Sequence, residues 1–281
     1  MPNPLDTPPV EPVAEQLVQI TDPGEVGRAD HNRIDRFVVQ LSNVIAWFFP
    51  ILMVIICAQV VLRTLGRSDI GPGNQAWMDD LQWWMYGFAC LIGIAYAITT
   101  NSHVRVDIFY DNFPKEKQSR IDKFALGWLL IPFLLLCWDV TFHYALASWE
   151  AGEGSSSPNG LHGLYFLKIG MNLTFIVMTI AAVAALVRNL AHSGPVTGVR
   201  FIGWAFPSVW FAINLALYYM AYWYVALTAP PDLNPRRYTR EPIFGEIEFG
   251  AYELEYTVLA ALAVTLVLYG IARMRARRGE G

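Results

Sequence analysis

The sequence predicts an all-α fold: an integral membrane bundle of about six transmembrane helices with both termini in the cytoplasm. Only 16% of the 281 residues are charged and 54% are hydrophobic, whereas soluble domains usually carry about 25% charged residues. The apolar residues gather in long runs, and about 20 such residues are enough for a helix to cross a hydrocarbon core of about 30 Å. The 10 Trp, 13 Tyr and 16 Phe suit a protein that lies across two membrane–water interfaces.

Six segments are apolar enough to cross a membrane as helices. Five of them contain no Asp, Glu, Lys or Arg, and the third contains one acid, Asp139. None alternates in polarity over about ten residues, as the strands of a membrane β-barrel do. Pro132 is expected to bend the third helix, because proline cannot donate a backbone hydrogen bond. The expected spans are residues 37–62, 81–102, 124–149, 169–187, 201–228 and 256–272.

The basic residues predict the orientation of these spans. Fourteen of the 20 Lys and Arg residues fall in the tails and loops on the side that holds both termini, and six fall on the other side. Cytoplasmic loops of membrane proteins carry the excess of Lys and Arg. Both termini are therefore expected in the cytoplasm, and an even number of spans agrees with that.

Several functional classes find no support in the sequence. The net charge is −4 and no basic patch is apparent, so no nucleic-acid partner is expected. The motifs HExxH, CxxC, GxSxG and Walker A are absent, so the chain is not expected to be an enzyme or to carry a metal or another cofactor. No internal repeat indicates the inverted-repeat architecture of many complete transporters.

Asp139 and His143 form a candidate polar pair inside the third span. Their i, i+4 spacing places them on one face of a helix, and intramembrane acids often mark ion pathways. A proton or sodium relay is one interpretation, and a structural pair against a neighbouring helix is the one that we favour. A haem axial ligand is a further alternative, but His143 is the one histidine within a predicted span and has no evident second ligand.

Trp77, Asp79 and Asp80 open the second span. Acids in the first turn complement the positive end of the helix dipole, and a tryptophan anchors the interface. The same residues can also form a polar docking surface for a partner. The sequence leaves both interpretations open.

One stretch of the chain resembles a known family. It comprises Trp77-Met78-Asp79-Asp80, the small-residue-rich segment 87–100, and His103-Val104-Arg105-Val106-Asp107. Together they are similar to the small permease subunit, the DctQ family, of tripartite ATP-independent periplasmic (TRAP) transporters, over residues 35–190.

The resemblance implies a non-catalytic scaffold in the inner membrane of a bacterium. Its partners would be a large TRAP permease subunit, which carries out sodium-coupled uptake of organic acids, and a periplasmic substrate-binding protein. His103, Arg105 and Asp107 then join Trp77, Asp79 and Asp80 as candidate partner contacts. The basic inner loop is also expected to meet membrane lipids with anionic headgroups. The alternative is an accessory subunit of another bioenergetic membrane complex.

The chain departs from the family pattern after Leu190, because family members usually have four spans. Three parts are therefore expected. They are a polar, largely disordered cytoplasmic tail (1–34), a four-helix DctQ-like membrane domain (35–190), and an extension with two more spans and a charged periplasmic loop (191–281).

Overall fold

The computed structural model describes residues 30–102, 110, 112–228, 230, 238–239, 241–249 and 252–279. Within these residues six helical segments are long and apolar enough to cross a membrane, and they confirm the predicted all-α fold. Most of the tail predicted for residues 1–34 and part of the loop before the last span lie outside the described residues. The spans are Arg33–Arg67, Ala76–Thr100, Lys115–Glu150, Leu164–His192, Phe206–Thr228 and Tyr256–Arg277.

The first and third spans are each built from more than one helical element. In the first, α1 (Arg33–Ala46) and α2 (Phe48–Arg67) meet at Trp47. In the third, α5 (Lys115–Phe124) continues through the π-helix η1 (Ala125–Leu130) into α6 (Ile131–Glu150). The second and fourth spans are the single helices α3 (Ala76–Thr100) and α7 (Leu164–His192).

The π-helix η1 lies just before Pro132, where a bend of the third span is expected. The Ile131 amide donates to the carbonyl of Leu126, five residues earlier, instead of four. The wider turn keeps the Ile131 N–H bonded just before a residue that has no N–H. Gly127 lies here against the backbone of Trp204 and Ala205, where a Cβ atom would come within 2.1 Å of the Trp204 carbonyl oxygen.

The expected span 201–228 is divided in two. The short helix α8 (Gly198–Trp204) ends before Ala205, and α9 (Phe206–Thr228) follows. Pro207 occupies the second position of α9, where its missing N–H costs no helical hydrogen bond. The last span is α10 (Tyr256–Arg277), preceded by the 3-10 turn η3 (Pro242–Phe244).

A small antiparallel hairpin leads into α10. Strands β1 (Glu246–Phe249) and β2 (Tyr252–Glu255) pair with Ile247 opposite Leu254. The charged loop expected before the last span thus contains a short sheet. It is too small to change the fold class.

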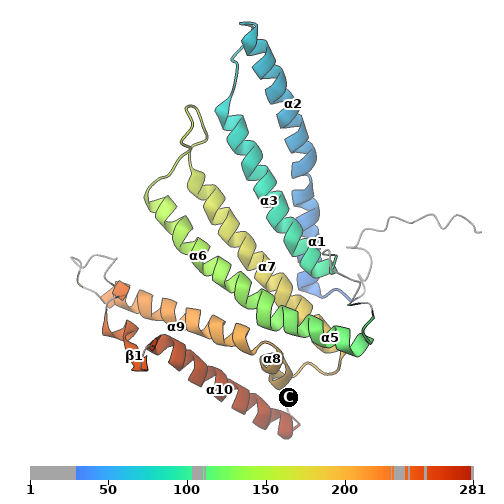
Figure 1. Cartoon of the computed structure of the whole chain (residues 1–281), viewed down its shortest axis with the longest axis vertical. Coiled ribbons are helices and arrows are strands. Elements are labelled where there is room, and N and C mark those ends of the chain that lie inside the picture. Colours follow the sequence, from blue (N-terminus) through green and yellow to red (C-terminus); the bar gives the residue numbers. More distant parts are fainter. Residues whose placement is uncertain are drawn as a thin grey trace, which may run out of the picture.

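Helix α7 lies at the centre of the bundle, between α3 and α6 (Figure 1). In its apolar part 44% of the residues are buried inside the chain, against 6% for the first span. Ala181, Ala182 and Ala185 are buried on α7, and such small side chains allow helices in membranes to approach closely. Beyond α6, α9 packs against α6 and η1, and α10 packs against α9 and α8.

Candidate functional site

The acids at the start of α3 make contacts within the chain. The Asp79 carboxylate accepts a hydrogen bond from Gln59 Nε2 at 2.7 Å, and Gln82 Nε2 donates to Gln59 Oε1 at 2.5 Å. Gln59 is the one buried residue of α2. Asp79 therefore fastens α2 to α3 through a polar network around the buried Gln59.

Asp80 holds the loop between α6 and α7. Its Oδ2 atom accepts the backbone N–H of Leu161 at 2.8 Å. Trp77, by contrast, is 40% exposed, and its indole N–H donates to Gln75 Oε1 at 3.3 Å. Asp79 and Asp80 thus make hydrogen bonds within the chain, whereas the Trp77 side chain is exposed on the surface. Its contact with a partner stays a prediction.

The predicted pair of Asp139 and His143 is joined through a third residue, Tyr219 of α9. The Tyr219 hydroxyl donates to Asp139 Oδ1 at 2.6 Å and lies 3.3 Å from His143 Nε2. The His143 ring stacks on the Tyr219 ring with centroids 5.9 Å apart. Trp138 and Phe142 contact the same tyrosine edge-on. The partner of the intramembrane acid is thus a neighbouring helix, and that helix belongs to the extension.

The other end of the bundle contains a buried ion pair that sequence reasoning missed. Arg188 Nη1 of α7 lies 2.7 Å from Asp35 Oδ2 of α1, and the Asp35 side chain is fully buried. Arg188 Nη2 also donates to the carbonyl of Thr99, near the end of α3, at 2.6 Å. One guanidinium therefore joins three helices.

The local pattern around Asp35 could have drawn attention to it. Asn32 and Asp35 form a capping box at the start of α1, with backbone-to-side-chain hydrogen bonds of 2.9 and 3.0 Å. Polar residues at this spacing before an apolar run mark a helix start. No comparable sequence signal indicates that Arg188 is the partner.

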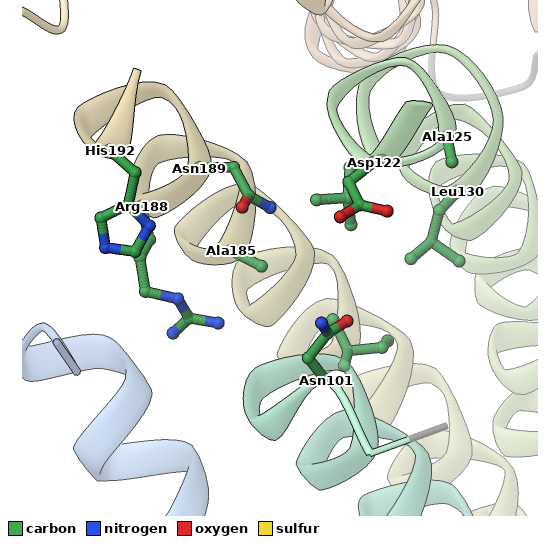
Figure 2. A pocket seen from close by; sticks show the side chains of 10 residues that line it. Asn101, Asp122, Ala125, Leu130, Ala185, Arg188, Asn189 and His192 are labelled. Carbon is green, nitrogen blue, oxygen red and sulfur yellow. The ribbon is translucent and has the colours of Figure 1, made fainter. Parts of the chain in front are cut away.

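A cavity of about 340 Å³ lies beside this ion pair. Figure 2 shows Arg188, Asn189 and His192 along the end of α7, with Asn101 and Asp122 across from them. Asn101, which lines the cavity, directly follows the end of α3. The candidate residues His103, Arg105 and Asp107 follow in the chain, but they lie outside the described residues.

Polar contacts also tie α6 to α7 at the end of the bundle near their connecting loop. Glu153 Oε2 pairs with Lys168 Nζ and accepts the Ser148 hydroxyl at 2.6 Å. The hydrogen bonds from Lys168 and then from Ser148 hold the pKa of Glu153 below its ordinary value. Deeper in the bundle, Asn172 Nδ2 donates to the Trp138 carbonyl at 2.7 Å. These side chains brace the helices against one another.

Comparison with known proteins identifies the family of this chain. The family model described as tripartite ATP-independent periplasmic transporters, DctQ component, matches residues 52–192. The match begins in α2 and runs to the end of α7, so α8, α9 and α10 lie beyond it. No curated protein and no solved structure matches the chain. The chain is a multi-pass membrane protein that belongs to the DctQ family, the small permease component of TRAP transporters.

Proposed function

We propose that this chain is the non-catalytic scaffold subunit of a TRAP transporter in the inner membrane of a bacterium. It would hold a large permease subunit in place during sodium-coupled uptake of organic acids, with a periplasmic protein delivering the substrate. Family membership supports the transporter class. The scaffold role rests on how the polar groups inside the bundle are used.

The observation that carries the proposal is that polar side chains within the spans bond to neighbouring helices. Asp139 accepts from Tyr219 on α9, and Asn172 donates to the Trp138 carbonyl on α6. The buried Lys168 on α7 pairs with Glu153 after α6. A carrier site near the bilayer midplane would instead keep such groups available to substrate and coupling ion. Polar side chains that bond to one another between helices stiffen the bundle, as a scaffold subunit requires.

The first span supplies a surface on which a partner can pack. Its apolar part is 6% buried, and Met53 and Val54 are 67% and 68% exposed. Trp77 is exposed at the start of α3, which packs against α2. We infer that the large subunit contacts this α2–α3 face, where an exposed tryptophan is a typical interface anchor.

Reconstitution tests the proposal directly. The chain alone in liposomes should give no sodium-driven uptake of an organic acid above empty vesicles. Uptake should require a large permease subunit and a binding protein in addition. Robust uptake by the chain alone would refute the scaffold role.

Co-purification locates the contact and tests the alternative assembly. Trp77→Ala should lower the yield of bound large subunit about fivefold or more, because interface tryptophans commonly contribute more than about 1 kcal/mol. Trp83→Ala is the matched control, since Trp83 is 72% exposed on another face of the same helix. Equal losses in both variants would place the contact elsewhere. Recovery of the subunits of a different bioenergetic complex would favour the accessory-subunit alternative.

A further inference from the structure

Two cations converge on one hydroxyl at the end of the bundle where α7 ends. Lys123 Nζ of α5 donates to Ser193 Oγ at 3.0 Å, and Arg200 Nη2 of α8 donates to the same oxygen at 2.7 Å. Lys123 is buried at 5% exposure, and its ammonium lies 5.2 Å from the centroid of the Trp204 ring. Arg200 is half-buried and also donates to the Pro195 carbonyl at 2.5 Å.

Neither cation has a counter-ion among the residues that the structure describes. The ion pairs formed there join Lys168 with Glu153 and Arg188 with Asp35. The charged groups that act on Lys123 are Arg200 and Arg120, and both are positive. Asp122 is next in the chain, but it accepts the Tyr110 hydroxyl at 2.7 Å and lines the cavity beside α3.

Like charges held together are unfavourable where one of them is buried, as Lys123 is, unless an anion compensates them. Ser193 offers each cation only a neutral oxygen, so the charge of the cluster remains uncompensated. The Ser193 hydroxyl donates its own hydrogen to the Leu190 carbonyl at 3.0 Å. The cluster of Lys123, Ser193 and Arg200 therefore has the chemistry of a phosphate site, in which an ammonium and a guanidinium are held together around one hydroxyl oxygen.

The surroundings indicate that the phosphate belongs to a lipid. Phe124 and Val196, next to the cluster in the chain, are 46% and 44% exposed. Trp128 stacks on Phe124 with ring centroids 5.5 Å apart, and exposed tryptophans are typical of the headgroup region. Helices α5 and α8 lie at the same end of the bundle (Figure 1). Phe124, Trp128 and Val196 thus form an exposed apolar surface beside the cluster. A free phosphate ion would gain no favourable contact with this surface, whereas the acyl chains of a lipid would cover it.

We propose that Lys123, Arg200 and Ser193 bind the phosphate group of an anionic phospholipid at this end of the bundle. The lipid would compensate the paired cations and fill the corner between α5, the end of α7 and α8. Since α8 lies beyond the family match, the site would also fasten the extension to the four-helix part. The proposal does not depend on the scaffold role.

The test uses the purified full chain in detergent, with lipid binding followed by native mass spectrometry and by the shift in melting temperature. Phosphatidylglycerol should bind and raise the melting temperature, and phosphatidylcholine should bind much more weakly. Lys123→Gln and Arg200→Gln should each weaken phosphatidylglycerol binding about fivefold, as expected for one basic residue near a lipid surface. Lys115→Gln on α5 and Arg275→Gln on α10 are matched controls, since both side chains are exposed.

The comparisons of lipids, control variants and free phosphate could give three results that would overturn the proposal. They are equal binding of both lipids, equal losses in the controls, and full stabilisation by inorganic phosphate that also displaces the lipid. Lys123→Arg keeps the charge and should keep the affinity, which separates loss of binding from loss of folding. Arg200→Gln decides the question if Lys123→Gln does not fold, because Arg200 is partly exposed. Unchanged affinity in Arg200→Gln would refute the site.

Discussion

The hydroxyl of Tyr219 donates a hydrogen bond to the Asp139 carboxylate at 2.6 Å. Asp139 lies within the segment that matches the DctQ family, and Tyr219 lies in the extension beyond it. An intramembrane acid, a group that is costly to leave unpaired in lipid, is thus satisfied by a helix that the family model does not include. The extension is therefore bound into the bundle by a specific polar contact as well as by apolar packing.

Tyr219→Phe should lower the free energy of unfolding by about 1 kcal/mol, because it removes the donor to Asp139 and leaves the ring contacts in place. Unfolding in mixed micelles by a denaturing detergent measures this change. Tyr224→Phe, on the same helix with a side chain that is 62% exposed, should match the unchanged protein. If the two variants unfold alike, the hydrogen bond contributes nothing to stability.

Arg188→Gln should destabilise the chain by about 3 kcal/mol, since it leaves the fully buried Asp35 carboxylate without its cation. Asp35→Asn should recover part of that loss when combined with Arg188→Gln, because the uncompensated charge is then gone. A double-mutant cycle in the same unfolding assay gives the coupling. Arg36→Gln, next to Asp35 but exposed, is the control and should have little effect. Additive losses in the cycle would show that the pair is not coupled.

The loop between α6 and α7 should lose stability in acid. The pKa of Glu153 is lowered in the folded chain by hydrogen bonds from Lys168 and Ser148. A lowered carboxyl pKa stabilises the fold fully above the ordinary value of 4.5 and loses that effect as the pH falls through the lowered pKa. The difference in melting temperature between the unchanged protein and Glu153→Gln should therefore shrink below pH 4.5. Glu150→Gln, which removes an exposed acid nearby, should show no such pH-dependent difference.

Both termini are predicted to be cytoplasmic, and reporter fusions can test this orientation. Alkaline phosphatase is active only after export, so a fusion after Pro235 should be active and a fusion at Gly281 should be silent. The expectation rests on the uneven distribution of Lys and Arg. An active fusion at Gly281 would show that the orientation is wrong.

The residues of the inner loop are predicted to contact the partner subunit. Arg105→Ala and Asp107→Ala should lower the melting temperature of the co-purified complex, because Arg105 can bond helix-end carbonyls or a partner's carboxylate. Lys115→Ala and Lys117→Ala, exposed on α5, are the controls. If all four variants have the same melting temperature as the unchanged complex, the loop is only solvated and the assignment of these residues as a site is wrong.

The sequence by itself determined the six spans and the family. Runs of apolar residues long enough to cross a bilayer can be recognised one segment at a time, because each helix satisfies its own backbone hydrogen bonds. The family emerged from Trp77-Met78-Asp79-Asp80 and from His103 to Asp107 in the same local way. The break between α8 and α9 and the short hairpin were missed, since both depend on how the chain packs beyond the apolar runs.

Only the tertiary structure decided which polar groups meet. Helix α9 carries Tyr218, Tyr219, Tyr222 and Tyr224, and the rotation of α9 against α6 selects the one that reaches Asp139. Arg188 reads in the sequence as one more cytoplasmic cation, yet it pairs with Asp35, far away in the chain. Helix rotation and depth are set by packing between helices, through the small residues of α7 and its neighbours. A single sequence fixes the length and polarity of each helix, whereas the faces that meet depend on all of the helices together.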